Sequence, residues 1–283
     1  MIITAPAKIN LALDVIGDRQ DGYHEVDMVM QSIGLSDRIQ LKTGEKIGLT
    51  CTNPQVPADR RNLAWRAAEL LQEVARERHG KTLGVEIHIE KRIPVAAGLA
   101  GGSTDAAGVL IGLNQLWDLG LTTEELMRLG VKLGADVPFC ILQRTARAEG
   151  IGEKLTVISS RLRCSVLLIT PDVQVSTAMV YHSLDTKGIR KHPDIQGVIA
   201  ALEAGDLERL CAVWGNVLEE VVLEKFPEVA GLKRLMQDFG VHSALMSGSG
   251  PSVFALNVDE NQAKAVKAAL PPTWFCTLTE FQQ

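Results

Sequence analysis

The stretch of residues 94–108, with the sequence PVAAGLAGGSTDAAG, constrains the fold of this chain more than any other. Before it, residues 85–89 alternate apolar and polar side chains, which predicts a strand. After it, apolar side chains recur at helical spacing, so we expect a helix from near Ser103 to about Trp117, capped by Ser103 or Thr104. A strand, a loop of small residues and a helix start bring backbone N–H groups and a helix dipole to one point. This arrangement is typical of phosphate binding.

The loop departs from the two most familiar phosphate-binding patterns. A Walker loop needs a lysine before the Ser/Thr at the helix start, where this chain has Gly102. A dinucleotide fingerprint needs G-x-G-x-x-G, and the spacing of Gly98 and Gly101 breaks it. A tight structural turn is therefore the alternative interpretation, and the rest of the chain must decide between the two.

Composition excludes several classes of protein. The 283 residues predict about two domains, and 46% hydrophobic with 22% charged residues supply ample core. A net charge of −5 disfavours a nucleic-acid or anionic-membrane binder, although Lys91 lies next to the loop. The five cysteines are scattered and odd in number, which indicates reduced thiols and neither disulfides nor a zinc site. With no signal peptide and no apolar run of about 18 residues, we expect a cytoplasmic protein without a metal site of its own.

The first half of the chain predicts strands before the loop and helices after it. A strand over residues 9–15 should end at Gly17 and carry Lys8 and Asn10 on the face opposite its apolar side chains. An Asp-Gly turn before Tyr23 and His24 predicts a hairpin. Further elements are expected as one or two strands within 37–51, a helix over 62–78 and a strand over 85–90.

Asp136 follows a second helix in this half. That helix should be capped by Thr122 or Thr123 and end at Gly134. Pro138 is expected to hold Val137 extended, which places Asp136 at a sharp junction. An aspartate there serves either as a turn former or in catalysis, and its position alone leaves both open.

The second half begins near residues 158–162, after a hairpin at about 148–158. It should contain a strand over 164–170, a loop that carries Thr177 and Tyr181, helices over 193–204, 206–222 and 226–239, strands over 244–247 and 253–256, a helix over 260–269 and a strand over 274–280. The turn at 246–252, MSGSGPS, is a second glycine-rich loop, which either joins two strands or closes over a polyphosphate. This order of elements predicts an α+β fold in both halves.

Three stretches together resemble the ordered motifs of the GHMP kinase superfamily: PAKINLALDVIG at 6–17, the glycine loop at 94–108 and LMSGSGPSVFAL at 245–256. Within it, DGYHEVDMVMQ at 21–31 and LGADVPF at 133–139 are similar to members that act on a cytidine-diphosphate-linked polyol in the non-mevalonate route to isoprenoids. The resemblance covers almost the whole chain. It implies an N-terminal α+β domain with a left-handed crossover (1–159), a ferredoxin-like C-terminal domain (160–283) and an active site in the cleft between them.

The resemblance also implies roles for individual residues. Lys8 and Asp136 match the catalytic pair, and Asn10, Tyr23, His24 and Tyr181 match substrate contacts, with the two tyrosines on opposite faces of the cytosine. The ATP-phosphate loop is matched by Pro94, Val95, Ala96, Ala97, Gly98, Leu99, Ala100, Gly101, Gly102, Ser103 and Thr104. Alanines stand at three positions where the family often has glycine, and Met30 replaces an aromatic residue of some members.

The implied reaction moves the γ-phosphoryl group of ATP, accompanied by Mg²⁺, to the tertiary 2-hydroxyl of a methylerythritol unit that carries cytidine diphosphate. Asp136 would accept the hydroxyl proton. Lys8 would keep Asp136 ionised and would stabilise negative charge at the reacting oxygen. The alternatives are another kinase of the superfamily, acting on mevalonate, homoserine or a sugar, and a nucleotide-binding module without catalysis. The DGYH motif disfavours the first alternative, and the lysine–aspartate pair disfavours the second.

Overall fold

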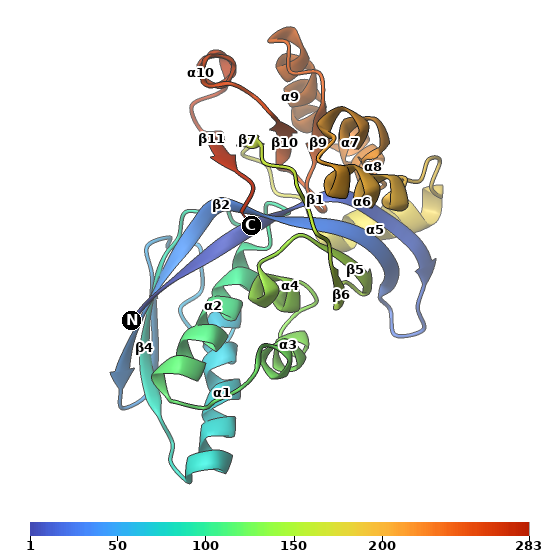
Figure 1. The fold of residues 1–283 in the computed structure, drawn as a ribbon. Coiled ribbons are helices and arrows are strands. Elements are labelled where there is room, and N and C mark those ends of the chain that lie inside the picture. The colour runs from blue at the N-terminus through green and yellow to red at the C-terminus, as the bar shows by residue number, and fades with distance from the viewer. Residues whose placement is uncertain (283) are drawn as a thin grey trace. The chain divides into compact units, whose positions relative to one another are not determined.

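The computed structural model describes residues 1–282, apart from the side chains of residues 185–187, and the chain forms two compact units (Figure 1). Unit 1 comprises Met1–Ala7, Leu35–Val95 and Ala100–Gln143, and unit 2 comprises Lys8–Gly34, Ala96–Leu99 and the chain from Arg144 onward. Two long strands, β1 (Ile2–Asp18) and β2 (His24–Gly44), contribute to both units. The glycine loop is likewise divided between them.

Unit 1 pairs the second half of β2 with two further strands and covers them with helices. In the antiparallel pair of β2 and β4, Ile39 lies opposite Ile89, and β3 runs parallel to β4. The elements that belong to this unit alone are β3 (Ile47–Cys51), β4 (Gly84–Glu90), α1 (Leu63–His79), α2 (Gly101–Leu116), α3 (Thr123–Val131) and α4 (Val137–Leu142).

Small side chains let α1, α2 and the strands of unit 1 approach closely. Helices α1 and α2 lie side by side in Figure 1, and α1 buries Ala64, Ala67 and Ala68. On α2, a Cβ atom at Gly108 or Gly112 would overlap a side chain of β2. The small residues of this helix therefore fix how the end of the glycine loop sits on the strands of its unit.

The predicted helix starts of unit 1 are only partly correct. Asn62 caps α1, and Thr122 caps α3 in a capping box with Glu125. The expected cap of α2 by Ser103 or Thr104 is wrong, because this helix already begins at Gly101, directly after Ala100 in a left-handed conformation. Both hydroxyls therefore lie inside the first turn of the helix.

The junction at Asp136 also differs from the prediction. Val137 is not extended but is the first residue of α4, with Pro138 in the first turn. Proline is tolerated there because the first N–H groups of a helix have no partner within the helix. Asp136 is the residue before the helix, and its side chain does not cap it.

Unit 2 adds strands to the second half of β1 and the first half of β2, and it contains a second sheet. β5 pairs antiparallel with β2, and β8 pairs parallel with β1, with Asn216 beside Leu13. The strands of this unit are β5 (Ala146–Gly150), β6 (Lys154–Val157), β7 (Ser165–Thr170), β8 (Gly215–Asn216), β9 (Ala244–Met246), β10 (Val253–Leu256) and β11 (Phe275–Glu280). Its helices are α5 (Thr177–Lys187), α6 (Ile195–Ala204), α7 (Leu207–Val213), α8 (Glu219–Lys225), α9 (Pro227–Asp238) and α10 (Glu260–Ala269).

The second sheet has the strand order β11-β7-β10-β9, with every neighbouring pair antiparallel. Counted along this half of the chain the order is 4-1-3-2, which is that of a ferredoxin-like sheet. The predicted α+β class and the ferredoxin-like C-terminal half are thus confirmed. The predicted division at residues 159/160 stays a prediction.

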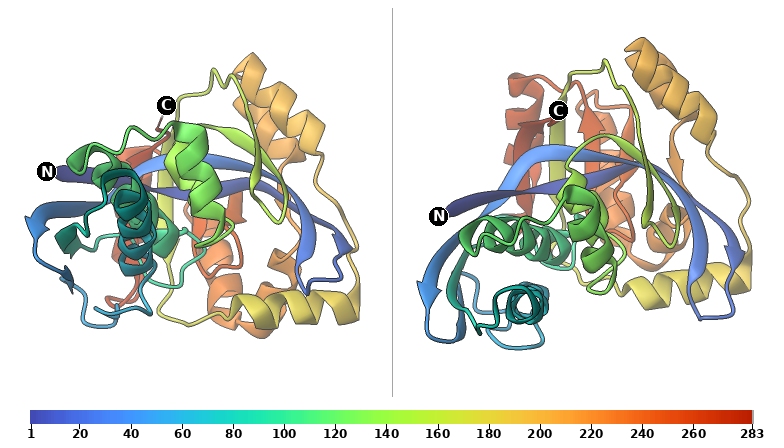
Figure 2. Two further views of the ribbon diagram at one scale, coloured as in Figure 1. Left: turned by 90° about the horizontal axis from the view of Figure 1, so that it is seen from below. Right: turned by 60° about the horizontal axis from the view of Figure 1, so that its bottom comes forward.

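Two predictions for the second half of the chain are wrong. The expected helix over 206–222 is divided into α7 and α8 by β8, because Gly215 and Asn216 pair with β1. The expected loop around Thr177 and Tyr181 is helix α5, capped by Ser176. Figure 2 shows this helix, in yellow, beside the blue hairpin that joins β1 and β2.

Among the residues that the structure describes, no helix combines the length and the hydrophobicity that a membrane span requires.

Candidate active site

Lys8 lies inside unit 2 rather than in solvent. It is 5% exposed, on a part of β1 that is buried on both faces. Its Nζ donates hydrogen bonds to Asn10 Oδ1 at 2.7 Å and to the carbonyl oxygen of Gly98 at 3.3 Å. The predicted catalytic lysine and the predicted substrate contact Asn10 are therefore neighbours, and Lys8 also contacts the glycine loop.

Gly98 joins the two glycine-rich loops of unit 2. Its φ is +74°, and a Cβ atom there would overlap the backbone oxygen of Ser247. The hydroxyl of Ser247 donates to the Gly98 carbonyl at 2.9 Å, so this oxygen accepts from both Ser247 and Lys8. The turn at 246–252 is therefore more than a connection between β9 and β10, since it packs directly against residues 96–99.

Asn216 and Glu219 hold the second loop in place. Asn216 Nδ2 donates to the carbonyl oxygens of Met246 at 2.8 Å and Gly248 at 2.7 Å. Glu219 accepts from the backbone N–H of Met246 at 3.0 Å and from Lys233 at 2.6 Å. Sequence reasoning missed both residues because it predicted a continuous helix over them. The Gly-Asn pair inside that helix was the available signal, since both residues are poor helix formers.

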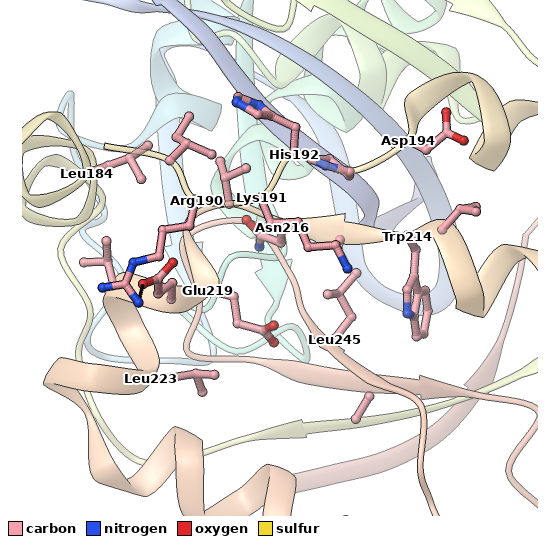
Figure 3. A pocket seen from close by; sticks show the side chains of 18 of the residues that line it. Leu184, Arg190, Lys191, His192, Asp194, Trp214, Asn216, Glu219, Leu223 and Leu245 are labelled. Atoms are coloured by element: carbon pink, nitrogen blue, oxygen red, sulfur yellow. Dashed lines mark ion pairs between the residues drawn. The ribbon is translucent and has the colours of Figure 1, made fainter. Parts of the chain in front are cut away.

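The same two side chains line a cavity of about 600 Å³ in unit 2 (Figure 3). None of the predicted site residues lines this cavity. Two of its basic residues contact acids, Arg190 with Glu220 at 3.0 Å and His192 Nδ1 with Asp14 Oδ1 at 2.8 Å. The cavity therefore lies beside the residues that hold the second loop, and Leu184 on α5, the helix of Tyr181, is among its lining residues.

In unit 1, the other half of the loop adjoins the turn that carries Asp136. A Cβ atom at Gly134 would lie 3.9 Å from Ser103 Oγ, so the first turn of α2 and the start of α4 are close. Thr104 is buried, and its hydroxyl donates to the carbonyl oxygen of Pro6 at 2.7 Å. Of the two hydroxyls in this turn, Ser103 is thus the more suitable for a ligand.

Three predicted substrate residues gather where the β1–β2 hairpin meets α5. The rings of His24 and Tyr181 have centroids 4.7 Å apart and planes tilted by 36°. Tyr23 precedes His24 and is 58% exposed. The structure places Tyr181 against His24, whereas the stacking of the two tyrosines on one base stays a prediction.

Comparison with known proteins identifies the family. Residues 62–144 match the GHMP kinases N terminal domain, and residues 198–275 match the GHMP kinases C terminal domain. A 4-diphosphocytidyl-2-C-methyl-D-erythritol kinase of Geobacillus sp. (strain WCH70) is 51% identical over 258 residues, which cover 90% of this chain and 88% of that protein. One from Bacillus subtilis (strain 168) is 49% identical, with coverage of 93% and 90%. The chain belongs to the 4-diphosphocytidyl-2-C-methyl-D-erythritol kinase family of the GHMP kinases.

Solved structures agree with this assignment. A crystal structure of 4-(cytidine 5'-diphospho)-2C-methyl-D-erythritol kinase matches with a TM-score of 0.83 at 34% identity, and it covers 100% of both chains. A homoserine kinase from Cytophaga hutchinsonii matches with a TM-score of 0.75 at 18% identity, over 100% of this chain and 94% of that one. The second match shows a shared fold alone.

Within each unit, the structure of this GHMP kinase brings predicted site residues together. In unit 2, Lys8, Asn10 and Gly98 form one hydrogen-bonded group, and His24 contacts Tyr181. In unit 1, Ser103 lies near the turn that leads to Asp136. The catalytic pairing of Lys8 with Asp136 stays a prediction.

Proposed function

We propose that this kinase transfers the γ-phosphoryl group of ATP to the 2-hydroxyl of 4-diphosphocytidyl-2-C-methyl-D-erythritol. The observation that carries the proposal is identity of about half the residues, over nine-tenths of the chain, to kinases named for that substrate. ATP is the phosphoryl donor. The N-terminal catalytic domain would end near residue 159, and the enzyme would work in the cytoplasm, where its five free cysteines stay reduced.

The proposed chemistry assigns a separate task to each group. The loop at 94–104 and the N-terminus of α2 would hold the phosphates through backbone N–H groups and the helix dipole. Asp136 would accept the proton of the 2-hydroxyl, or orient that hydroxyl, as the oxygen attacks phosphorus. Lys8 would stabilise the negative charge that develops at the reacting oxygens. Asn10, which accepts from Lys8 at 2.7 Å, would fix the direction of its ammonium group.

Mg²⁺ accompanies ATP in this proposal. In the part of the chain that the structure describes, no three His, Cys, Asp or Glu side chains gather closely enough to hold a metal ion. The residues therefore fit an ion coordinated mainly by the phosphates, with the Ser103 hydroxyl as a suitable oxygen from the protein. Bound there, the ion would offset the charge of the phosphates.

The test compares possible acceptors in one assay of ADP release. The cytidylylated methylerythritol should be turned over, whereas mevalonate, homoserine and galactose should not. Asp136→Asn should lower kcat by roughly 10²- to 10⁴-fold, the usual contribution of a positioned acid or base, and Asp118→Asn, at an exposed aspartate, should not. Turnover of another acceptor at a higher kcat/KM would replace the proposed substrate.

A second pair of variants tests whether the ring of Tyr181 recognises the cytosine. Tyr181→Ala should weaken the cytidine substrate by about 5- to 150-fold, since stacking on a base contributes about 1–3 kcal/mol. Tyr181→Phe keeps the ring and should change little. ATP affinity should stay the same in both variants, and an equal loss for the two ligands would make Tyr181 a residue of the fold instead.

A further inference from the structure

Three charged side chains meet under the glycine loop in unit 1, at positions 37, 91 and 105. They are Asp37 on β2, Lys91 just after β4, and Asp105 in the first turns of α2, and we call them the base cluster. Each side chain is at most 4% exposed. Lys91 Nζ lies 2.5 Å from Asp37 Oδ2 and 2.7 Å from Asp105 Oδ2.

The base cluster also binds backbone at both ends of the loop. Asp37 Oδ1 accepts from the N–H groups of Arg92 at 2.6 Å and Ile93 at 2.9 Å, immediately before the loop begins. Lys91 Nζ donates its third hydrogen bond, of 3.0 Å, to the carbonyl oxygen of Gly101, where α2 begins. The entry and the exit of this half of the loop are therefore tied to one ammonium group.

The two carboxylates of the base cluster differ in how many hydrogen bonds they accept. Asp37 has hydrogen bonds to both carboxylate oxygens, whereas Asp105 Oδ1 is buried without a partner. Burial is the main cause that raises the pKa of Asp105 to about 7, and Asp37 raises it further, while Lys91 opposes the shift. Asp37 is thus the acid of the pair whose oxygens are fully hydrogen-bonded, whereas the surroundings of Asp105 favour its neutral form.

We infer that Lys91 is a positioning residue for ATP. Through its bonds to Asp37 and to the Gly101 carbonyl, Lys91 holds the two ends of the phosphate loop at the spacing that nucleotide binding needs. The inference rests on the proposed ATP-binding role of this loop. Lys91 acts through the backbone and does not itself have to touch the nucleotide. Because a bound phosphate is held by several N–H groups at once, a small change in the spacing of the loop ends weakens all of them together.

The test measures binding directly, by titration calorimetry with a non-hydrolysable ATP analogue and separately with the cytidylylated substrate. Lys91→Met should weaken the ATP analogue by about 10- to 100-fold and leave the affinity for the cytidine ligand within about twofold. Lys42→Met, at an exposed lysine on β2 of the same unit, is the matched control and should change neither. Unchanged ATP affinity in Lys91→Met would overturn the inference.

A double variant separates positioning from neutralisation of buried charge. Lys91→Met leaves two buried acids without their cation, which also lowers the melting temperature. Adding Asp37→Asn removes one of these acids but keeps a side-chain oxygen for the N–H groups of Arg92 and Ile93, so it should restore most of the melting temperature. ATP affinity should stay low because the bond to the Gly101 carbonyl is still missing. If ATP affinity returns together with stability, Lys91 only neutralises charge and the inference fails.

Failure of the proposed function would look different. If the wild-type chain binds the ATP analogue and not the cytidine compound, the proposed substrate is refuted. The ATP affinities of the wild type and the Lys91 variants would still decide the inference.

Discussion

The two halves of the glycine loop are anchored by different physical means. In unit 2, residues 96–99 are fixed by shape, because Gly98 leaves no space for a Cβ atom beside Ser247. Lys8 adds a single charged hydrogen bond there, to a neutral carbonyl. In unit 1, the loop ends are fixed by charge, through the base cluster of Asp37, Lys91 and Asp105.

This difference predicts which substitutions each half tolerates. A site held by close backbone approach tolerates no added atom but is insensitive to pH. A site held by buried charges tolerates an isosteric neutral side chain, depends on its counter-ion and responds to pH. In the loop, residues 96–99 are thus held by close backbone contact, whereas its ends in unit 1 are held by charged groups that include Asp105, whose pKa is raised to about 7.

The largest expected effect comes from adding one carbon to the shape-fixed half. Gly98→Ala should cost about 3–5 kcal/mol of stability, since it combines a left-handed alanine with overlap against a backbone oxygen. Phosphoryl transfer should fall with it, because residues 96–99 must move away from the turn at 246–252, with which Gly98 shares a hydrogen bond. Chemical denaturation and ADP release measure the two effects.

Gly102→Ala is the matched control on the same loop. A Cβ atom there would meet only Leu63, at 3.8 Å, and alanine favours the helix. Its stability should equal or exceed that of the wild type. If Gly98→Ala proves as stable as Gly102→Ala, the contact between the two glycine-rich loops does not anchor residues 96–99.

The next effect is a pH dependence that belongs to the charge-fixed half. Asp105 has a pKa of about 7 in the folded chain, raised from 3.8, with Lys91 and Asp37 in contact with it and Cys51 nearby on β3. Between pH 4 and 7 the folded state therefore binds more protons than the unfolded state, and this group makes the protein less stable as pH rises. Above about pH 7 the contribution levels off.

Asp105→Asn removes the titrating carboxyl group and so isolates its contribution to the pH dependence of stability. The stability of the variant relative to wild type should rise by about 2–4 kcal/mol from pH 4 to pH 8, since one pKa unit corresponds to about 1.4 kcal/mol. Denaturation of both proteins at several pH values gives the difference, and Asp118→Asn controls for loss of an exposed carboxylate. A difference that stays constant with pH would mean that Asp105 is ionised throughout.

The sequence predicted the parts of this site that depend on neighbouring residues. The strand before the loop, the helix after it and the capping box at Thr122 are all set within a few positions along the chain. The base cluster depends instead on strand register. Arg38 pairs with Glu90 in the antiparallel ladder, which brings Asp37 to Lys91, and no local pattern specifies that pairing. Asn216 was missed for the same reason, because its strand exists only through its pairing with β1.

The smallest expected effect concerns one alanine in each half of the loop. Ala96 and Ala100 have φ values of 53° and 56°, a left-handed conformation that costs a side chain about 1–2 kcal/mol. Glycine removes that strain but gives the unfolded chain more freedom, so Ala96→Gly and Ala100→Gly should each raise stability by at most about 1 kcal/mol.

The two alanine variants should nevertheless differ in ATP affinity. Lys91 already holds the carbonyl oxygen of Gly101, the residue after Ala100, so Ala100→Gly should leave ATP binding unchanged. Ala96 is exposed and is not held in this way. Ala96→Gly should therefore weaken ATP binding by about two- to threefold, because it makes the loop more flexible. Ala97→Gly, at a buried alanine with an ordinary φ, is the control and should lower stability. Thermal melting and titration with the ATP analogue measure both quantities. A larger loss of ATP affinity in Ala100→Gly than in Ala96→Gly would show that the charged anchor does not rigidify its half of the loop.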